Sequence, residues 1–151
     1  MTSLTYGEVF LRLAAAVAAG ALIGLNRELR GKPAGLRTLA LVALGSAVFV
    51  LETLDPTRGA YTDGTARVIQ GIVTGVGFLG AGSIMRGTDE ESVRGLTTAA
   101  SIWLAAATGI ACGLAQWPLV VGGGGLGLLV LVIAPGRVIH NRRRSDPTES
   151  G

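Results

Sequence analysis

The hydrophobic positions of this chain form long runs, which short polar and charged segments separate. A helix that crosses a membrane needs about 17–25 consecutive, mostly apolar residues, and several of these runs are that long. The predicted helices are Val9–Leu25, Leu36–Leu54, Val68–Met85, Leu96–Leu114 and Leu119–Ile139. The pattern therefore predicts an all-α membrane protein with five transmembrane helices over residues 1–140. A basic tail over residues 141–151 follows, which we expect to be disordered.

Basic residues are distributed unevenly around these helices. Ten of the 13 Lys and Arg residues lie on one side of the predicted membrane. Four of them follow the first predicted helix, two follow the third, and four lie at or after the end of the fifth. Cytoplasmic loops of membrane proteins carry an excess of Lys and Arg. The distribution therefore predicts an external N-terminus and a cytoplasmic C-terminus.

The overall composition agrees with a membrane protein, since mean hydropathy is +0.53 and only 15% of residues are charged. The pI of 9.8 could suit a nucleic-acid-binding protein. Because the cations lie in short segments beside apolar helices, topology and attraction to anionic membrane lipids explain them better. We expect membrane lipids, and no nucleic acid, as partners. The single cysteine, Cys112, is predicted to be a small packing residue of the fourth helix.

The 24 glycines suggest how the helices pack. In the first and third predicted helices, Gly20/Gly24 and Gly71/Gly75 are GxxxG pairs. This spacing places two small residues on one helix face and lets a neighbouring backbone approach. This face could serve packing within one chain or the seam of a homodimer, and the sequence leaves both interpretations open. The glycines expected to pack helices are Gly20, Gly24, Gly71, Gly75, Gly80 and Gly82.

A weak internal repeat relates the first helix pair to the second. The segment RGKPAGLRTLALVALG begins at Arg30, and RGTDEESVRGLTTAASIWLAAATG begins at Arg86. Each has Arg-Gly after one helix and Gly-Leu-x-Thr at the start of the next. These units would form a parallel repeat with its axis along the membrane normal. The alternative is a coincidence between two glycine-rich apolar segments.

Several polar residues at the helix ends are candidates for function. Glu8 and Arg12 are four residues apart, so they share a helix face, and Arg12 would pair with Glu8 or extend toward the membrane surface. Arg67 could meet Asp55 or Asp63 of the external loop. Hydroxyl side chains within helices commonly bond a carbonyl one turn back or a neighbouring helix. The functional candidates are Glu8, Arg12, Asn26, Arg27, Glu28, Arg37, Thr38, Asp55, Arg67, Gln70, Arg94, Thr97, Thr98 and Ser101.

The cytoplasmic starts of the second and fourth helices form a second candidate region. Gly35 and Gly95 would let the chain turn there, and the free N–H groups of each helix start carry partial positive charge. With Arg37 and Arg94 beside them, these helix starts could bind an anionic group, such as a lipid phosphate or the acidic residues 89–91. The alternative is that both arginines anchor the helices at the lipid headgroups.

No catalytic pattern is present in the sequence. The only histidine is His140, in the tail, and no HExxH, GxSxG or phosphate-binding loop occurs. We therefore expect no enzyme activity and no cofactor. All ten acidic residues lie in predicted loops, tails or helix ends, whereas a Mg²⁺ path would need oxygen ligands at membrane depth. This disfavours a Mg²⁺ channel within one chain.

Three segments resemble the N-terminal membrane domain of the MgtC/SapB family: ALIGLNRELRGKPAGLRTLALVALGSAVF (21–49), RVIQGIVTGVGFLGAGSIMRG (67–87) and VRGLTTAASIWLAAATGIACG (93–113). GFLGAG and RGLTTAAS, after AGLRT, are specific in combination. The family often has an acidic residue before Arg-Glu, where this chain has Asn26. Better-known members carry a further ACT-like cytoplasmic domain, and this chain is expected to lack it.

The resemblance implies a multi-pass protein of the bacterial inner membrane, linked to magnesium homeostasis and, in some members, to virulence. It implies a non-enzymatic regulator of other membrane proteins, such as the F-type ATP synthase or transport systems, which acts through helix contacts. From the GxxxG pairs we also expect a homo-oligomer, a dimer. The alternative is a transporter for Mg²⁺ or another small solute, with a pathway between protomers. A third hypothesis for the function is a featureless membrane scaffold.

Overall fold

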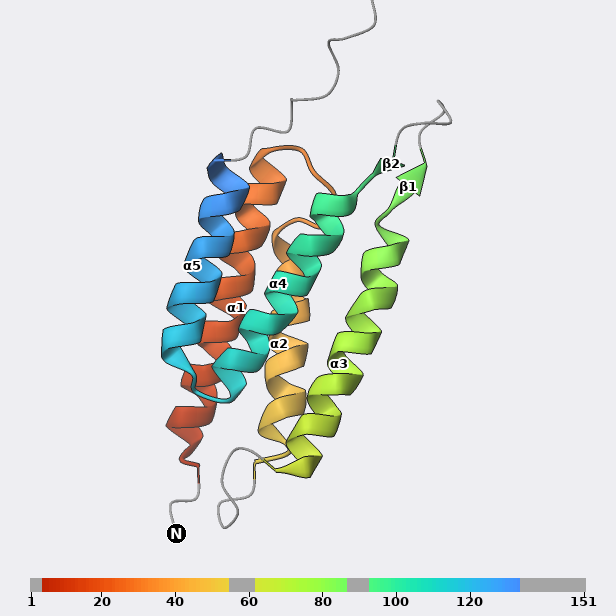
Figure 1. Cartoon of the computed structure of the whole chain (residues 1–151). Helices are drawn as coiled ribbons and strands as arrows, with labels where there is room; N and C mark the ends of the chain where they lie inside the picture. The colour runs from red at the N-terminus through yellow and green to blue at the C-terminus, as the bar shows by residue number, and fades with distance from the viewer. Residues whose placement is uncertain (1–3, 55–61, 87–92, 134–151) are drawn as a thin grey trace, which may run out of the picture.

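The computed structural model describes residues 4–54, 62–86 and 93–133, and it is helical over most of them (Figure 1). A two-stranded antiparallel sheet pairs Met85 with Arg94 and Arg86 with Val93. The elements are α1 (Tyr6–Leu29), α2 (Leu36–Leu51), α3 (Asp63–Gly82), β1 (Met85–Arg86), β2 (Val93–Arg94), α4 (Leu96–Gly113) and α5 (Trp117–Ile133). The prediction of five helices is confirmed within these described ranges, whereas the two short strands were not predicted.

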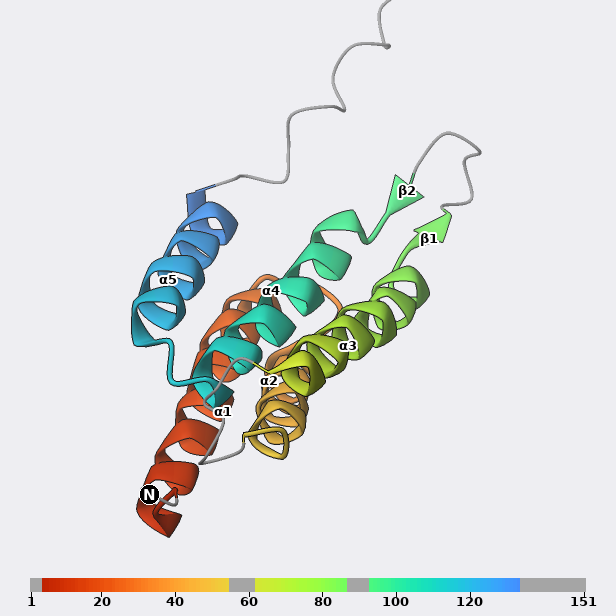
Figure 2. The same cartoon turned by 60° about the horizontal axis from the view of Figure 1, so that its bottom comes forward.

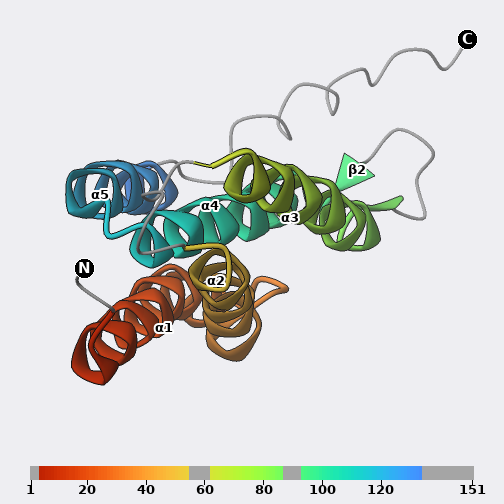
Figure 3. The same ribbon diagram turned by 90° about the horizontal axis from the view of Figure 1, so that it is seen from below.

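The helices form two layers around α4. Seen from below, α1 and α2 form one layer, and α5, α4 and α3 lie across them in the other (Figure 3). The α4 helix contacts all the other helices, whereas α2 and α3 barely touch each other. A tilted view shows β1 and β2 extending past the ends of α3 and α4 (Figure 2). The position of α4 makes it the common packing partner of the fold.

Helix boundaries differ from the predicted ones where polar side chains fix them. The α3 helix begins at Asp63, earlier than predicted, because the Thr62 hydroxyl accepts a hydrogen bond of 3.2 Å from the backbone N–H of Thr65. The same helix ends at Gly82, so Met85, predicted to be helical, lies in β1. The α5 helix begins at Trp117, since Pro118 is well tolerated in a first helical turn. The last predicted residues of this helix lie outside the described ranges.

Small residues let the backbone of α2 approach two other helices. A Cβ atom added to Gly20 would lie 2.5 Å from the carbonyl oxygen of Leu39, and one added to Gly24 would lie 2.6 Å from the Cα of Leu36. The α4 helix approaches α2 in the same way, since a Cβ atom added to Gly113 would lie 2.9 Å from the carbonyl oxygen of Ala47. The interior of α1, α2 and α4 is therefore built largely of glycine and alanine, with Cys112 fully buried among them.

Glycines of α3 behave differently. A Cβ atom added to Gly71, Gly75 or Gly82 would meet no atom within 4 Å, whereas one at Gly80 would contact Ala99 of α4 at 3.5 Å. Packing within the chain was therefore the wrong interpretation for Gly71 and Gly75. The physical reason is that α3 packs against α4 through a different face, the one that carries Gly80. The homodimer seam at these glycines stays a prediction.

Some of the apolar helices have the length and composition that crossing a membrane requires. Among the described residues, α1 and α4 are each long and apolar enough to cross a membrane by length and composition. The α2 and α5 helices are apolar but shorter, at 16 and 17 residues. The five-span topology and its orientation stay predictions, as does the parallel repeat of helix pairs.

Candidate functional site

Arg12 lies inside the helix packing and joins α1 to the end of α4. Only 8% of the residue is exposed. Its Nη1 donates a 2.8 Å hydrogen bond to the carbonyl oxygen of Gly113, and its Nη2 forms an ion pair with Glu8. Carbonyls in the last turn of a helix have no partner within the helix and carry partial negative charge. Arg12 therefore pairs with Glu8, as one prediction had it, and also satisfies a carbonyl of α4.

Arg27 makes the matching contact at the other end of α1. Its Nη2 donates a 2.6 Å hydrogen bond to the hydroxyl of Thr98, and both residues are buried. Arg12 and Arg27 are 15 residues apart on α1, which corresponds to about 22 Å of helix. Two arginine contacts therefore hold α1 against α4 near both helix ends.

These contacts leave a few buried polar atoms unsatisfied. Within the described residues, the Nε atoms of Arg12 and Arg27 and the Oδ1 atom of Asn26 have no hydrogen-bond partner. Asn26 precedes Arg27 at the same end of α1, where the family often has an acidic residue. With Thr98, these residues form the most polar part of the helix interior near the predicted cytoplasmic side.

Glu28 occupies the start of α2. Its Oε2 accepts a 2.9 Å hydrogen bond from the backbone N–H of Leu36. A Cβ atom on Gly35 would lie 2.7 Å from this oxygen, so a larger residue there would displace the Glu28 carboxylate. A carboxylate at a helix start is favourable because the free N–H groups carry partial positive charge. The anion expected at this helix start is thus supplied by the chain itself.

The start of α4 depends on Gly95. Its φ angle of +99° lies in the left-handed region, and an added Cβ would overlap the carbonyl oxygen of Ser83. The flanking candidate Arg94 is exposed, as are Arg37 and Thr38 at the start of α2. The acidic residues 89–91 lie outside the described residues. Anion binding at this helix start therefore stays a prediction.

Most of the buried hydroxyl groups of α4 donate hydrogen bonds to backbone carbonyls of the same helix. Ser101 donates a 2.7 Å hydrogen bond to the carbonyl of Thr97, and Thr108 donates one of 2.8 Å to that of Leu104. These bonds confirm the prediction of hydrogen bonds one turn back. Thr98 is the exception, since it accepts its bond from another helix. Thr97 itself is exposed.

Arg67 and Gln70 lie exposed on α3. The predicted pair with Asp63 does not form: within residues 4–54, 62–86 and 93–133, the only ion pair is Arg12–Glu8. Asp63 and Arg67 are four residues apart, but Asp63 is the first residue of the helix and both side chains are exposed. Asp55, the other predicted partner, lies outside the described residues.

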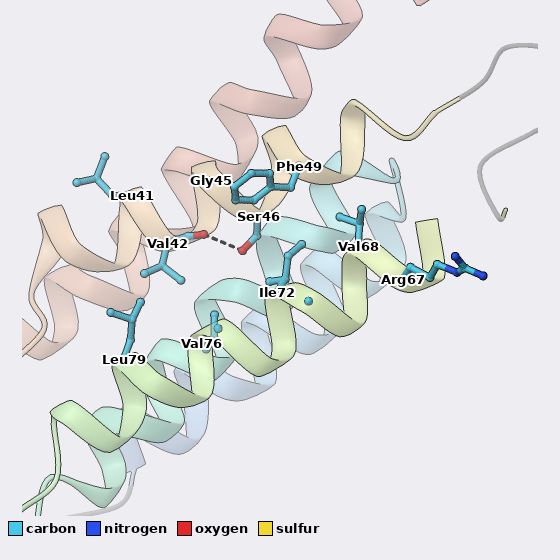
Figure 4. A pocket seen from close by; sticks show the side chains of 12 residues that line it. Leu41, Val42, Gly45, Ser46, Phe49, Arg67, Val68, Ile72, Val76 and Leu79 are labelled. Carbon is cyan, nitrogen blue, oxygen red and sulfur yellow. Dashed lines mark hydrogen bonds between the residues drawn. The ribbon is translucent and has the colours of Figure 1, made fainter. Parts of the chain in front are cut away.

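Sequence reasoning missed an open groove between α2 and α3. It has a volume of about 690 Å³ (Figure 4). Sequence reasoning also missed Gly109 and Gly113, although their GxxxG spacing was a readable signal. The residues that line the groove are Leu41, Val42, Gly45, Ser46, Phe49, Arg67, Val68, Gly71, Ile72, Gly75, Val76 and Leu79.

The described residues contain no group of three or more His, Cys, Asp or Glu side chains placed to hold a metal ion. The polar chemistry that these residues bring together consists of the two arginine contacts and the Glu28 cap. All three are charge-assisted hydrogen bonds between helices or at a helix start.

Comparison with known proteins identifies relatives over most of the chain. Protein MgtC of Salmonella typhimurium is 50% identical over 107 residues, which cover 71% of this chain and 44% of that protein. Protein SrpB of Synechococcus elongatus is 44% identical over 117 residues, covering 72% of this chain and 64% of that protein. The protein of Escherichia coli K12 named "Putative magnesium transporter YhiD" is 38% identical over 140 residues, which cover 83% of this chain and 60% of that protein.

The chain thus spans about half the length of the curated relatives that it matches. No solved structure matches it. The model of the MgtC family matches residues 13–141, a range that includes all five helices except the first residues of α1. On this match and these relatives, the chain belongs to the MgtC family of membrane proteins.

Proposed function

We propose that this protein is a non-enzymatic regulator of other proteins in the bacterial inner membrane, linked to magnesium homeostasis. The observation that carries the proposal is the closed interior of α1, α2 and α4. Backbone lies against backbone at Gly20, Gly24 and Gly113, so these three helices leave little room for a solute between them.

The buried charges also support a role without transport. The guanidinium groups of Arg12 and Arg27 both bond to groups of α4. A cation path would place oxygen ligands toward its lumen, whereas these two sites present cations to other parts of the protein. The surface available to a partner is the outward side of the helices, where Phe78 of α3 is 81% exposed and Val121 of α5 is 75% exposed.

The printed name of one relative supports the connection with magnesium. That relative is called a putative magnesium transporter. The regulatory role, a homodimeric state and contacts with ATP synthase or transporters are parts of the proposal. So is the orientation with an external N-terminus and a cytoplasmic C-terminus.

The alternative is a transporter for Mg²⁺ or another small solute, and the printed name of this relative favours it. The closed interior would then require a pathway between protomers. Purified protein in liposomes that contain a fluorescent Mg²⁺ indicator measures flux directly. Growth at low Mg²⁺ of a strain that lacks its own MgtC-family protein measures function in cells.

A regulator restores growth but gives no Mg²⁺ flux above that of empty liposomes. Arg27→Gln serves as the test variant, and Lys32→Gln, which removes an exposed cation, is the matched control for charge. Saturable Mg²⁺ flux, lost in a variant that also fails to restore growth, would contradict the proposal and favour transport.

A further inference from the structure

The groove between α2 and α3 is apolar along its length and open at its side. Its wall residues are aliphatic or aromatic, apart from glycine, Ser46 and Arg67. Ser46 donates its hydroxyl hydrogen to the carbonyl of Val42 at 2.8 Å, so it presents no free donor to the groove (Figure 4). A volume of about 690 Å³ is in the range of sites that hold a ligand. The groove therefore suits a hydrocarbon group.

Missing side chains produce this hollow. Gly45 of α2 and Gly71 and Gly75 of α3 line it, and a Cβ added at any of them would meet no atom within 4 Å. The two helices make few contacts with each other, so neither fills the space left by the other. Something outside the described chain can therefore lie along the groove.

Arg67 places a positive charge at one end. Figure 4 shows its side chain at the end of the groove, with the guanidinium directed away from the apolar residues. It lies near the first turn of α3, and it has no ion-pair partner among the described residues. An occupant with an apolar body and one anionic end would match this arrangement of charge.

The length of the groove matches one half of a bilayer. Arg67 and Leu79 at its ends are 12 residues apart on α3, or about 18 Å of helix. The hydrocarbon core of a bilayer is about 30 Å thick, so one leaflet contributes about 15 Å. An acyl chain that begins at the depth of Arg67 would therefore extend along the groove without leaving its own leaflet.

We propose that this groove binds an acyl chain of an anionic glycerophospholipid, whose phosphate contacts Arg67. The lipid belongs to the leaflet on the side of the α3 N-terminus. Its hydrocarbon chain lies over Gly71 and Gly75 and against the apolar side chains of α2. The guanidinium favours an anionic headgroup over a zwitterionic one.

Charge disfavours a second copy of the chain as the occupant. In a parallel dimer with its axis along the membrane normal, the same face of both chains meets at the seam. A seam through Gly71 and Gly75 would place both Arg67 side chains at one depth on the two sides of the axis. The repulsion between these cations would oppose the dimer, whereas an anionic lipid is attracted by the same residue.

The test measures lipid binding to the purified full chain in detergent by native mass spectrometry. The probes are dioleoyl phosphatidylglycerol, which is anionic, and dioleoyl phosphatidylcholine, which is zwitterionic. We expect the wild type to retain the anionic lipid preferentially. Arg67→Gln should weaken its binding about fivefold and leave phosphatidylcholine binding unchanged. Lys32→Gln, which removes another exposed cation, should bind both lipids as the wild type does.

Variants that fill the groove test whether the acyl chain binds there. Gly75→Leu should reduce binding of both lipids, and Gly77→Leu, on the side of α3 away from the groove, should not. Gly45→Leu narrows the same groove from α2, so the test remains decisive if Gly75→Leu fails to fold. Unchanged lipid binding in Arg67→Gln and in either groove variant would overturn the proposal. The proposal would also be overturned if the wild type forms a dimer, and Gly75→Leu separates that dimer without changing lipid binding. The occupant of the groove would then be a second copy of the chain.

Discussion

Replacing Gly20 with alanine tests the close contact between α1 and α2. The new Cβ atom would lie 2.5 Å from the carbonyl oxygen of Leu39 and 2.8 Å from the Cβ of Ala43. Ordinary contacts begin at 3.4 Å, so α2 would have to move by about 0.9 Å. The obstructing atoms belong to the backbone and to a buried Ala43, and neither can rotate aside. Overpacking of this kind typically costs about 1–3 kcal/mol.

Helix propensity acts in the opposite direction and needs a control. Alanine is favoured over glycine within a helix by about 1 kcal/mol. Gly75→Ala gains the same propensity, but its Cβ would meet no atom within 4 Å. The difference between the two variants therefore isolates the packing cost. We expect Gly75→Ala to equal or exceed the wild type in stability and Gly20→Ala to fall about 1–3 kcal/mol below Gly75→Ala.

Equilibrium unfolding in detergent, followed by circular dichroism, measures this difference. In a chain of this size, 1 kcal/mol shifts the melting temperature by about 2–4 °C, so the two variants should be clearly separated. If Gly20→Ala is as stable as Gly75→Ala, the α1 and α2 backbones do not lie in contact, and the closed interior loses its main support.

Three other expectations test different parts of the structure. Thr98→Val removes the hydrogen-bond acceptor of buried Arg27, so the free energy of unfolding should fall by about 1–3 kcal/mol in the same assay. Thr98→Ser, which keeps the hydroxyl, should lose less. Gly95→Ala should also lower the melting temperature, because φ of +99° strains any residue with a Cβ and the added atom overlaps a carbonyl oxygen. A reporter enzyme that is active only outside the cytoplasm should be active when fused after Asp55 and inactive after Glu90. Activity after Glu90 would contradict the predicted orientation.

The length of the apolar runs was enough to predict the helices, because a long apolar run satisfies its backbone hydrogen bonds within a membrane by forming a helix. The contact between Arg12 and Glu8 was also predictable, since four residues along a helix bring side chains together by local geometry. Boundaries were less accurate: the Thr62 cap starts α3 earlier than the apolar run alone indicated. The hairpin of β1 and β2 gave no readable signal, because each strand has only two residues.

Contacts between distant residues could not be predicted from the sequence. The hydrogen bond from Arg27 to Thr98 joins residues 71 positions apart, and nothing local to either residue indicates the other. GxxxG spacing identifies a helix face but does not say what lies in front of it. For that reason the same motif contacts α2 at Gly20 and faces an open groove at Gly75.

The two arginine contacts of α1 also bear on how the chain is assembled during synthesis. Arg12 bonds to a carbonyl that lies 101 positions later in the sequence. When α1 leaves the ribosome, Glu8 is the only one of its two partners that already exists. A charged residue in the middle of a membrane helix opposes insertion by about 2.5–3.5 kcal/mol, and near the surface by less. The hydrogen bond that completes the partners of Arg12 can therefore form only after the fourth helix has been made, so this contact is completed late in translation.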